Sequence, residues 1–225
     1  MNKRILLLSI LGLSLSTSPV LPLRSTNQAV QPTEAKTTVI ASRQFSMEYR
    51  YHAKSVSDIF KDNILLNLAY LNGTVTKASD INWAEIEKPF SFKFTLNPNE
   101  TFAYHDQVLP EYKGKVKLTT NSTFGKSDGY KSDGLLYGDG VCQLASLISW
   151  AAKDAKLAVK APSNHDFAAI PEVPKSQGVA IYYDPNNKSK GPYENLYITN
   201  NQAKPVDFIF DYKDGMLKVT VATQS

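Results

Sequence analysis

A single cysteine, Cys142, limits how this chain can hold a fold together. With one thiol in 225 residues, no disulfide can form within the chain, which excludes the class of small disulfide-stapled domains. The composition, 42% hydrophobic and 20% charged, is ordinary for a globular protein with one apolar core. We therefore expect one folded domain whose stability comes from packing.

The first 24 residues have the character of an export segment. Lys3 and Arg4 precede an uncharged, mostly apolar stretch from Ile5 to Leu23, and Arg24 follows it. We predict that residues 1–24 are a signal peptide or an N-terminal membrane anchor, with cleavage and retention both open. The protein is then extracytoplasmic, either secreted or anchored to the cytoplasmic membrane, and only this segment contacts a membrane. A single unpaired thiol is unusual in an oxidising compartment, so we expect Cys142 to have a specific role.

The next segment, 25–41, is rich in Thr, Gln, Pro and Ala, which predicts a flexible linker. An N-terminal helix and strand part, 42–96, follows the linker. Its apolar residues repeat at three and four positions from Ser55 to the turn at Asn72, which predicts an amphipathic helix. Alternating patterns predict strands at 90–96 and 116–120.

A second helix is predicted from Cys142 to about Ala155, with its apolar positions on one face. Short β-rich runs then dominate, at 157–160, 179–183, 195–199, 206–212 and 217–221. Turn sequences separate the last three runs, which predicts an antiparallel meander. The predicted fold class is α+β: one domain with a Cys-led central helix packed on antiparallel strands, preceded by the N-terminal amphipathic helix.

The thiol of Cys142 is predicted to point away from the core. At 100° per residue, the apolar face of the second helix centres nearly opposite this residue. Gly138, Asp139 and Gly140 suit a tight turn that delivers the thiol to the helix N-terminus, where unpaired N–H groups favour a thiolate. Such a position makes a nucleophile or a metal ligand.

A cysteine nucleophile needs a base, and the histidines are His52, His105 and His165. We favour His165, because the chain after the helix is long enough to return to the helix start. An orienting third residue would come from a later segment, where Asn195 and Asp184 are the available polar groups. Asn195 is the expected third member, and Asp184 stays the open alternative.

Three further residues are expected to contact a substrate. Gln143 is placed to donate a hydrogen bond to an oxyanion through its side chain or its backbone N–H. Ser146 is one of the small helix neighbours that leave room beside the thiol, and Asp139 lies in the turn before it. No recognised ligand spacing supports a metal site, and no cofactor is expected.

Several motifs together resemble the VanW family. GDGVCQLAS, around Cys142, is similar to the family's Gly-rich turn followed by I-C-Q-x-S/A-S/T at a helix start. NPNETFAYHD, SNHDF, EVP and NLYITNN resemble further family motifs in the family's order. His165 falls on the second histidine of H-x-H-S, whereas Asn195 falls on a family Asp. The resemblance covers about 97–210 and implies a VanW-like domain over 97–225.

The resemblance implies an exported cell-envelope protein, and two functions stay open. One is a non-catalytic or uncharacterised module that acts at the cell wall, with peptidoglycan as its partner. The other is a cysteine-dependent acyl transferase or hydrolase on peptidoglycan peptide, with Cys142 as nucleophile and His165 as base. Family members are linked by name to vancomycin-resistance gene clusters, but no resistance role for this chain follows.

The charge of the chain adds one exclusion. The formal net charge is +4, and its lysines are scattered instead of forming a stripe. Nucleic-acid binding is therefore not expected. The sequence predicts no particular oligomeric state.

Overall fold

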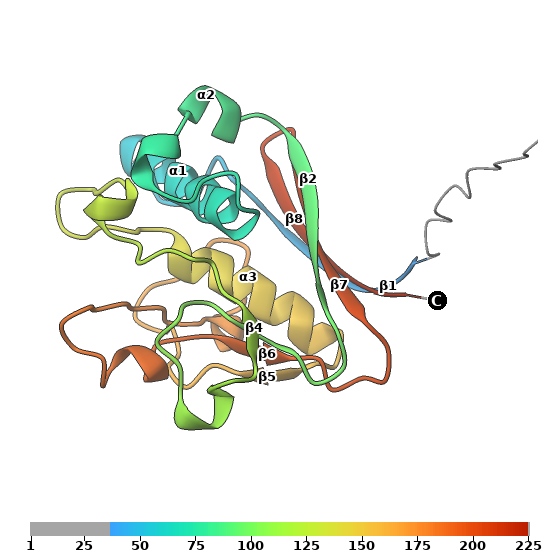
Figure 1. The fold of residues 1–225 in the computed structure, drawn as a ribbon. Coiled ribbons are helices and arrows are strands. Elements are labelled where there is room, and N and C mark those ends of the chain that lie inside the picture. Colours follow the sequence, from blue (N-terminus) through green and yellow to red (C-terminus); the bar gives the residue numbers. More distant parts are fainter. Residues whose placement is uncertain (1–36, 225) are drawn as a thin grey trace, which may run out of the picture. The chain divides into compact units, whose positions relative to one another are not determined.

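Helix α3 (Val141–Asp154) contacts both β-sheets of the domain (Figure 1). This computed structural model describes residues 37–224, which form two long helices, one short helix and eight strands. Helix α1 (Lys54–Leu71) packs on α3, and the short α2 (Trp83–Ile86) follows α1. Single 3-10 turns lie at Ala78–Asp80, Pro110–Tyr112, Lys126–Asp128, Lys175–Gln177 and Gly191–Tyr193. The predicted α+β fold class is confirmed.

The first sheet is antiparallel, with the strand order β1-β8-β7-β2. Its strands are β1 (Thr37–Ser46), β2 (Phe90–Leu96), β7 (Val206–Lys213) and β8 (Met216–Gln224). The β7–β8 hairpin turns through Asp214 and Gly215, which both have positive φ, as tight hairpin loops of the primed type require. Since β1 and β2 pair with C-terminal strands, the predicted 42–96 and 97–225 parts fold together.

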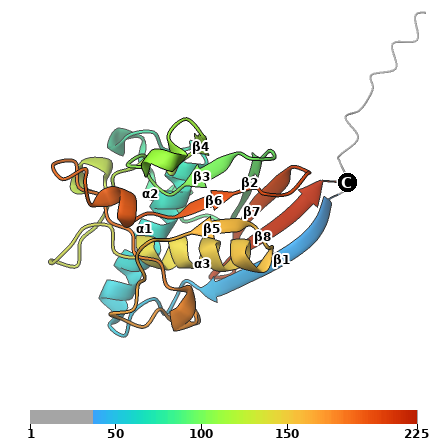
Figure 2. The same cartoon turned by 90° about the horizontal axis from the view of Figure 1, so that it is seen from below.

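The second sheet is mixed, with the order β4-β3-β6-β5, and β3 and β4 are its parallel pair. Its short strands are β3 (Thr101–Ala103), β4 (Val116–Leu118), β5 (Ala158–Lys160) and β6 (Tyr197–Thr199). Figure 2 shows β5 beside α3, with β6, β3 and β4 beyond it. This sheet packs against α3 through its edge strand β5.

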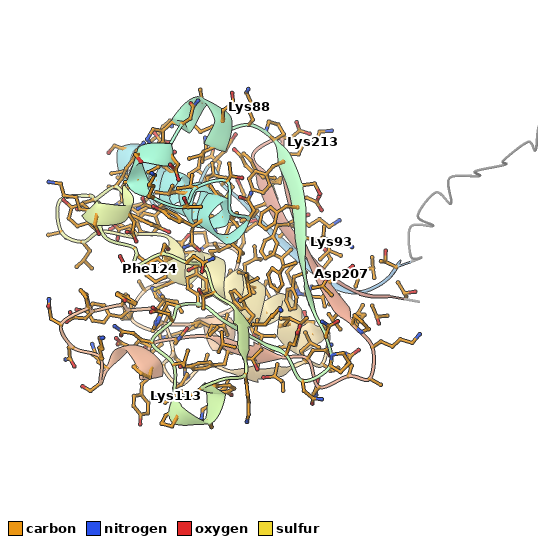
Figure 3. The ribbon with its side chains drawn as sticks, in the orientation of Figure 1. Lys88, Lys93, Lys113, Phe124, Asp207 and Lys213 are labelled. Carbon is orange, nitrogen blue, oxygen red and sulfur yellow. The ribbon has the colours of Figure 1, made fainter. Side chains whose placement is uncertain are left out.

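The pairing of β2 with β7 illustrates how alternation separates the two faces of a strand. Phe92 stacks on Phe210 and Phe94 on Phe208, each pair with ring centroids 5.0 Å apart. On the other face Lys93 lies 2.8 Å from the carboxylate of buried Asp207 (Figure 3). The aromatic face packs on the core, and the ion pair covers the opposite face.

Three strand predictions are wrong. β6 lies in the mixed sheet, so the last three runs form no meander, and only β7 and β8 make a hairpin. Residues 179–183 are not a strand. β1 begins at Thr37, inside the predicted linker, because pairing with β8 orders a segment whose side chains are mostly exposed.

The rest of the predicted linker and the predicted export segment lie outside the described residues. Within 37–224, none of the helices has the length and apolarity that crossing a bilayer requires. The predicted amphipathic helix from Ser55 and the Cys-led helix are both present, as α1 and α3.

Candidate functional site

A cavity of about 550 Å³ is lined by residues at the N-terminal end of α3. Figure 1 shows that this end of the helix points away from the antiparallel sheet. Its walls come from segments far apart in sequence: Arg50 to Phe60, the loop that leads into α3, the 165–169 loop, the 180–183 segment and Glu194. Phe124, labelled in Figure 3, stands near the start of α3 and contributes to the wall. The size of this cavity is typical of a small-ligand site.

Gly140 is the reason that α3 can begin so close to α1. It is the N-cap of α3, with φ +98°, and a Cβ there would lie 2.6 Å from the Phe60 carbonyl oxygen. Only glycine combines this left-handed conformation with this close approach. The Gly-rich turn predicted before Cys142 therefore has a packing role at the cavity floor.

The Cys142 thiol is engaged by the backbone of Ile181. The Ile181 N–H donates to Sγ over 3.3 Å, and the thiol itself points to the Ile181 carbonyl oxygen over 3.6 Å. Burial raises the pKa of the Cys142 thiol to about 11, which outweighs the lowering effect of the Ile181 N–H. This environment favours the neutral thiol near pH 7 and does not support the predicted activated thiolate.

Ser146, one turn later on α3, also binds this segment. Its hydroxyl donates to the Cys142 carbonyl over 2.7 Å and accepts the Val179 N–H over 2.9 Å. Its side chain is fully buried and is not part of the cavity wall, so the predicted substrate contact is wrong. Cys142 and Ser146 instead accept hydrogen bonds from two alternate N–H groups, those of Ile181 and Val179. The segment that carries these groups covers the face of α3 that was predicted to point away from the core.

His165 lies in the cavity wall with Cys142, but no hydrogen bond joins the two side chains among the described residues. Its ring is 4.1 Å from the Phe167 ring, centroid to centroid, and its Nδ1 is buried without a partner. Burial lowers the pKa of His165, which favours the neutral imidazole. A Cβ on Gly178 would collide with the His165 carbonyl oxygen, so close backbone packing fixes this loop.

Asn195 serves a different histidine from the one predicted. Its Oδ1 accepts the N–H groups of His105 and Leu196, and its Nδ2 donates to the carbonyl oxygens of His105 and Gln107. These four backbone groups fix the orientation of the amide, so Nδ2 also faces His105 Nδ1, at 3.3 Å. Asn195 is fully buried and makes no described bond to His165, which contradicts the predicted orienting role.

The His105 ring is held as the neutral tautomer by this arrangement. Its Nδ1 faces a donor, so its Nε2 carries the hydrogen and donates to the Glu194 carbonyl oxygen at 3.1 Å. Burial lowers the pKa of His105 to about 4. The ring also meets Tyr183 edge to face, so this buried network supports the cavity wall from behind.

Asp184, the alternative third member, is a turn residue. Its carboxylate accepts the Asn186 N–H over 2.8 Å, and its carbonyl oxygen accepts a bond from Gln107 Nε2. It is not part of the cavity wall. No described residue therefore completes the predicted triad of Cys142 and His165.

The Gln143 side chain offers an acceptor, whereas the prediction was a donor from this side chain or from the Gln143 backbone N–H. Its Nε2 donates to the Arg50 carbonyl oxygen over 3.0 Å, whereas its buried Oε1 has no partner. Arg50 also lines the cavity, and its guanidinium pairs with Glu172 at 2.8 Å. Burial lowers the pKa of Arg50 to about 10, so it stays cationic at neutral pH.

Asp139, predicted to contact a substrate, lines the cavity. Its Oδ2 is buried without a partner, and burial, with the nearby Asp133 carboxylate, raises the pKa of Asp139 to about 6. Glu194 is a second carboxylate of the wall, with Oε2 also buried and without a partner.

Most of the wall is aromatic or aliphatic, and the sequence interpretation missed it. The aromatic members are Tyr51, Phe60, Phe124, Tyr137, Phe167, Tyr182 and Tyr183. Phe167 is 78% exposed and Leu136 is 66% exposed, which is unusual for such large apolar side chains. The exposure of Leu136 could have been predicted from the sequence, because it lies between Asp and Gly turn residues where no regular element can bury it.

No three-membered group of His, Cys, Asp or Glu suited to a metal ion occurs in the described part of the chain. Comparisons with family models, with curated proteins and with solved structures gave no match to this chain.

Proposed function

We propose that this chain is a VanW-like exported protein of the cell envelope that binds a cell-wall component in the α3 cavity without chemistry at Cys142. The observation that carries the proposal is a largely apolar cavity whose rim leaves Phe167 and Leu136 exposed. Exposed apolar groups around a hollow are typical of ligand sites. The motifs around Cys142 and His165, which resemble the VanW family, support the envelope as the place of action.

The state of the thiol argues for binding over catalysis. A nucleophilic cysteine needs a lowered pKa or a base within hydrogen-bond reach. Cys142 has a pKa raised to about 11, and its described polar contacts are to the backbone of Ile181 and to no side chain. The cysteine-dependent acyl transferase or hydrolase stays the second candidate, because Cys142 and His165 share the cavity wall.

Titration with soluble peptidoglycan fragments, followed by backbone amide NMR shifts, tests the proposal. We expect shifts at Phe167 and Tyr182 and at least fivefold weaker binding after Phe167→Ala. Tyr193→Ala is the matched control, because Tyr193 is an exposed aromatic residue that does not line the cavity. Absence of binding by every fragment, or equal losses in both variants, would overturn the proposed site.

Mass analysis of the same fragments after incubation separates the two candidates. The binding module leaves them intact. Cleavage or transfer that is lost in Cys142→Ala would replace it with the enzyme.

A further inference from the structure

The cavity is acidic although the chain as a whole is basic. Its wall holds three carboxylates, Asp133, Asp139 and Glu194, against one guanidinium, that of Arg50, whereas the chain carries a net charge of +4. The Arg50 guanidinium is already paired with Glu172 and lies 4.0 Å above the Phe45 ring. The local field therefore favours a cation over an anion.

The buried side-chain atoms without a partner in the wall are mainly acceptors. They include Asp139 Oδ2, Glu194 Oε2 and Oε1 of Gln143, a residue that is only 5% exposed. His165 Nδ1 is unpartnered too and donates or accepts according to the tautomer, and Arg50 Nε is a donor. A buried acceptor without a partner is unfavourable, so a ligand that brings N–H donors is stabilised here.

Lys190 shows that an ammonium group fits this chemistry. Its Nζ lies 3.2 Å from Glu194 Oε1 and 4.8 Å from the centre of the Tyr182 ring, and both of these residues line the cavity. One ammonium thus uses a carboxylate and an aromatic face together, the pairing that recognises organic cations. The second oxygen of Glu194 remains unused.

We propose that the cavity selects ligands that carry a primary ammonium group on an apolar body. The ammonium group donates to Asp139, Gln143 and Glu194, and the apolar body packs on the aromatic wall around Phe167 and Tyr182. This inference rests on the proposed function and narrows its ligand to a wall peptide with a free side-chain amine.

Three probes of similar size test the charge preference directly: phenethylammonium, 2-phenylethanol and 3-phenylpropionate. Their affinities are measured by NMR titration of the full chain at pH 7.5. We expect the ammonium to bind at least tenfold more tightly than the alcohol, and the carboxylate to bind most weakly. Equal affinity of the ammonium and the alcohol would overturn the inference and leave an apolar binding site.

Variants locate the ammonium group. Asp139→Asn and Glu194→Gln should each weaken phenethylammonium at least fivefold and change 2-phenylethanol less than twofold. Lys190→Gln should strengthen it, because the competing ammonium is gone. Glu85→Gln, an exposed carboxylate on α2, is the matched control and should change neither affinity. Loss of affinity for the alcohol as well as the ammonium in both cavity variants would overturn the assignment.

The two proposals are then tested together by measuring the binding of a wall peptide with a free side-chain amine and of its side-chain N-acetylated form. Binding of the free amine form alone supports both. Equal binding of the two forms overturns the inference but keeps the proposed function. Selective binding of phenethylammonium with no binding of either peptide keeps the inference and overturns the proposed function.

Discussion

The backbone N–H of Ile181 donates a hydrogen bond to the sulfur of Cys142 over 3.3 Å, although 39 residues separate the two in sequence. The thiol in turn points to the carbonyl oxygen of Ile181. The one cysteine of the chain is thus a backbone anchor for the 179–183 segment. Burial raises the pKa of the Cys142 thiol and so favours its protonated form.

Alkylation of Cys142 should be slow and should accelerate only in strong alkali. The thiolate is the reactive form, and burial raises the pKa of this thiol to about 11. The iodoacetamide rate is measured against pH on the folded chain and again in denaturant. An inflection below about 8.5, the ordinary value for a free cysteine, would show an activated thiol and favour the enzyme.

Removing either anchor of the 179–183 segment should destabilise the domain. Cys142→Ala and Ser146→Ala each leave a backbone N–H, of Ile181 or Val179, without its acceptor. We expect losses of about 1–3 kcal/mol in the free energy of unfolding, measured with urea. Cys142→Ser, which keeps an acceptor, should lose less than Cys142→Ala.

The double variant tests whether the two anchors act on one segment. If Val179 and Ile181 leave α3 together, the combined loss should be smaller than the sum of the single losses. Strict additivity would show that each contact acts alone. An unchanged stability in both single variants would show that the segment is held by its apolar side chains.

The sequence predicts much of the frame that carries the site. The period of α1 and α3, the Gly-rich turn before Cys142 and the Asp214-Gly215 hairpin are local signals, and the structure confirms them. His165 was predicted as the base for Cys142, and the structure places both residues in one cavity wall without a described hydrogen bond between their side chains. These features depend on neighbours within a few residues, or on one long return of the chain.

The remaining features depend on contacts that leave no local pattern. Residues 179–183 have the composition of a strand, yet side chains of α3 bind their N–H groups in place of a second strand. Asn195 was paired with His165 by chain order, whereas the backbone places it against His105. Tyr51, Phe167 and Tyr182 come from three separate segments, so their spacing in the sequence does not predict that they line the same cavity.

Gly140→Ala should destabilise the domain more than Gly73→Ala does. Both glycines have positive φ, which costs other residues about 1–2 kcal/mol. A Cβ at Gly73 meets nothing within 4 Å, but a Cβ at Gly140 would lie 2.6 Å from the Phe60 carbonyl oxygen. Urea denaturation of both variants measures the difference. Equal losses would show that α1 and α3 can separate at this point without effect.

His105 should make the domain sensitive to acid. Its pKa is about 4 when folded and about 6.5 ordinarily, so between these values the unfolded chain holds more protons. Its contribution is complete above pH 6.5 and is lost as the pH falls towards 4, by up to about 3 kcal/mol. Protonation of Nδ1 would also place two donors, His105 and Asn195 Nδ2, face to face.

The pH dependence of unfolding in His105→Gln isolates this effect. We expect the variant to lose less stability than the natural chain between pH 6.5 and 4. His52→Gln removes an exposed histidine and serves as the control. Parallel curves for the natural chain and His105→Gln would contradict a buried neutral imidazole.

Asp139→Asn should stabilise the ligand-free protein at pH 7, whereas the loss of a polar contact ordinarily destabilises a protein. Burial raises the pKa of Asp139 to about 6 from its usual 3.8, so between these values the native state holds more protons than the unfolded chain. The free energy of unfolding therefore falls as the pH rises through this window, and the whole penalty is present above pH 6. The variant's gain should be present at pH 7 and largely vanish at pH 4, as measured with urea.

An ammonium ligand should stabilise the natural chain more than it stabilises Asp139→Asn. Phenethylammonium brings a positive charge to the Asp139 carboxylate, so it should raise the melting temperature of the natural chain at pH 7 and barely change that of Asp139→Asn. A carboxylate that lowers the stability of the ligand-free protein and gains a partner when a cation binds has the character of a binding residue, because proteins tolerate such a loss where function requires it. If Asp139→Asn is less stable at pH 7, the carboxylate has a stronger internal partner than the Asp133 backbone, and the cavity has one acceptor fewer for its ligand.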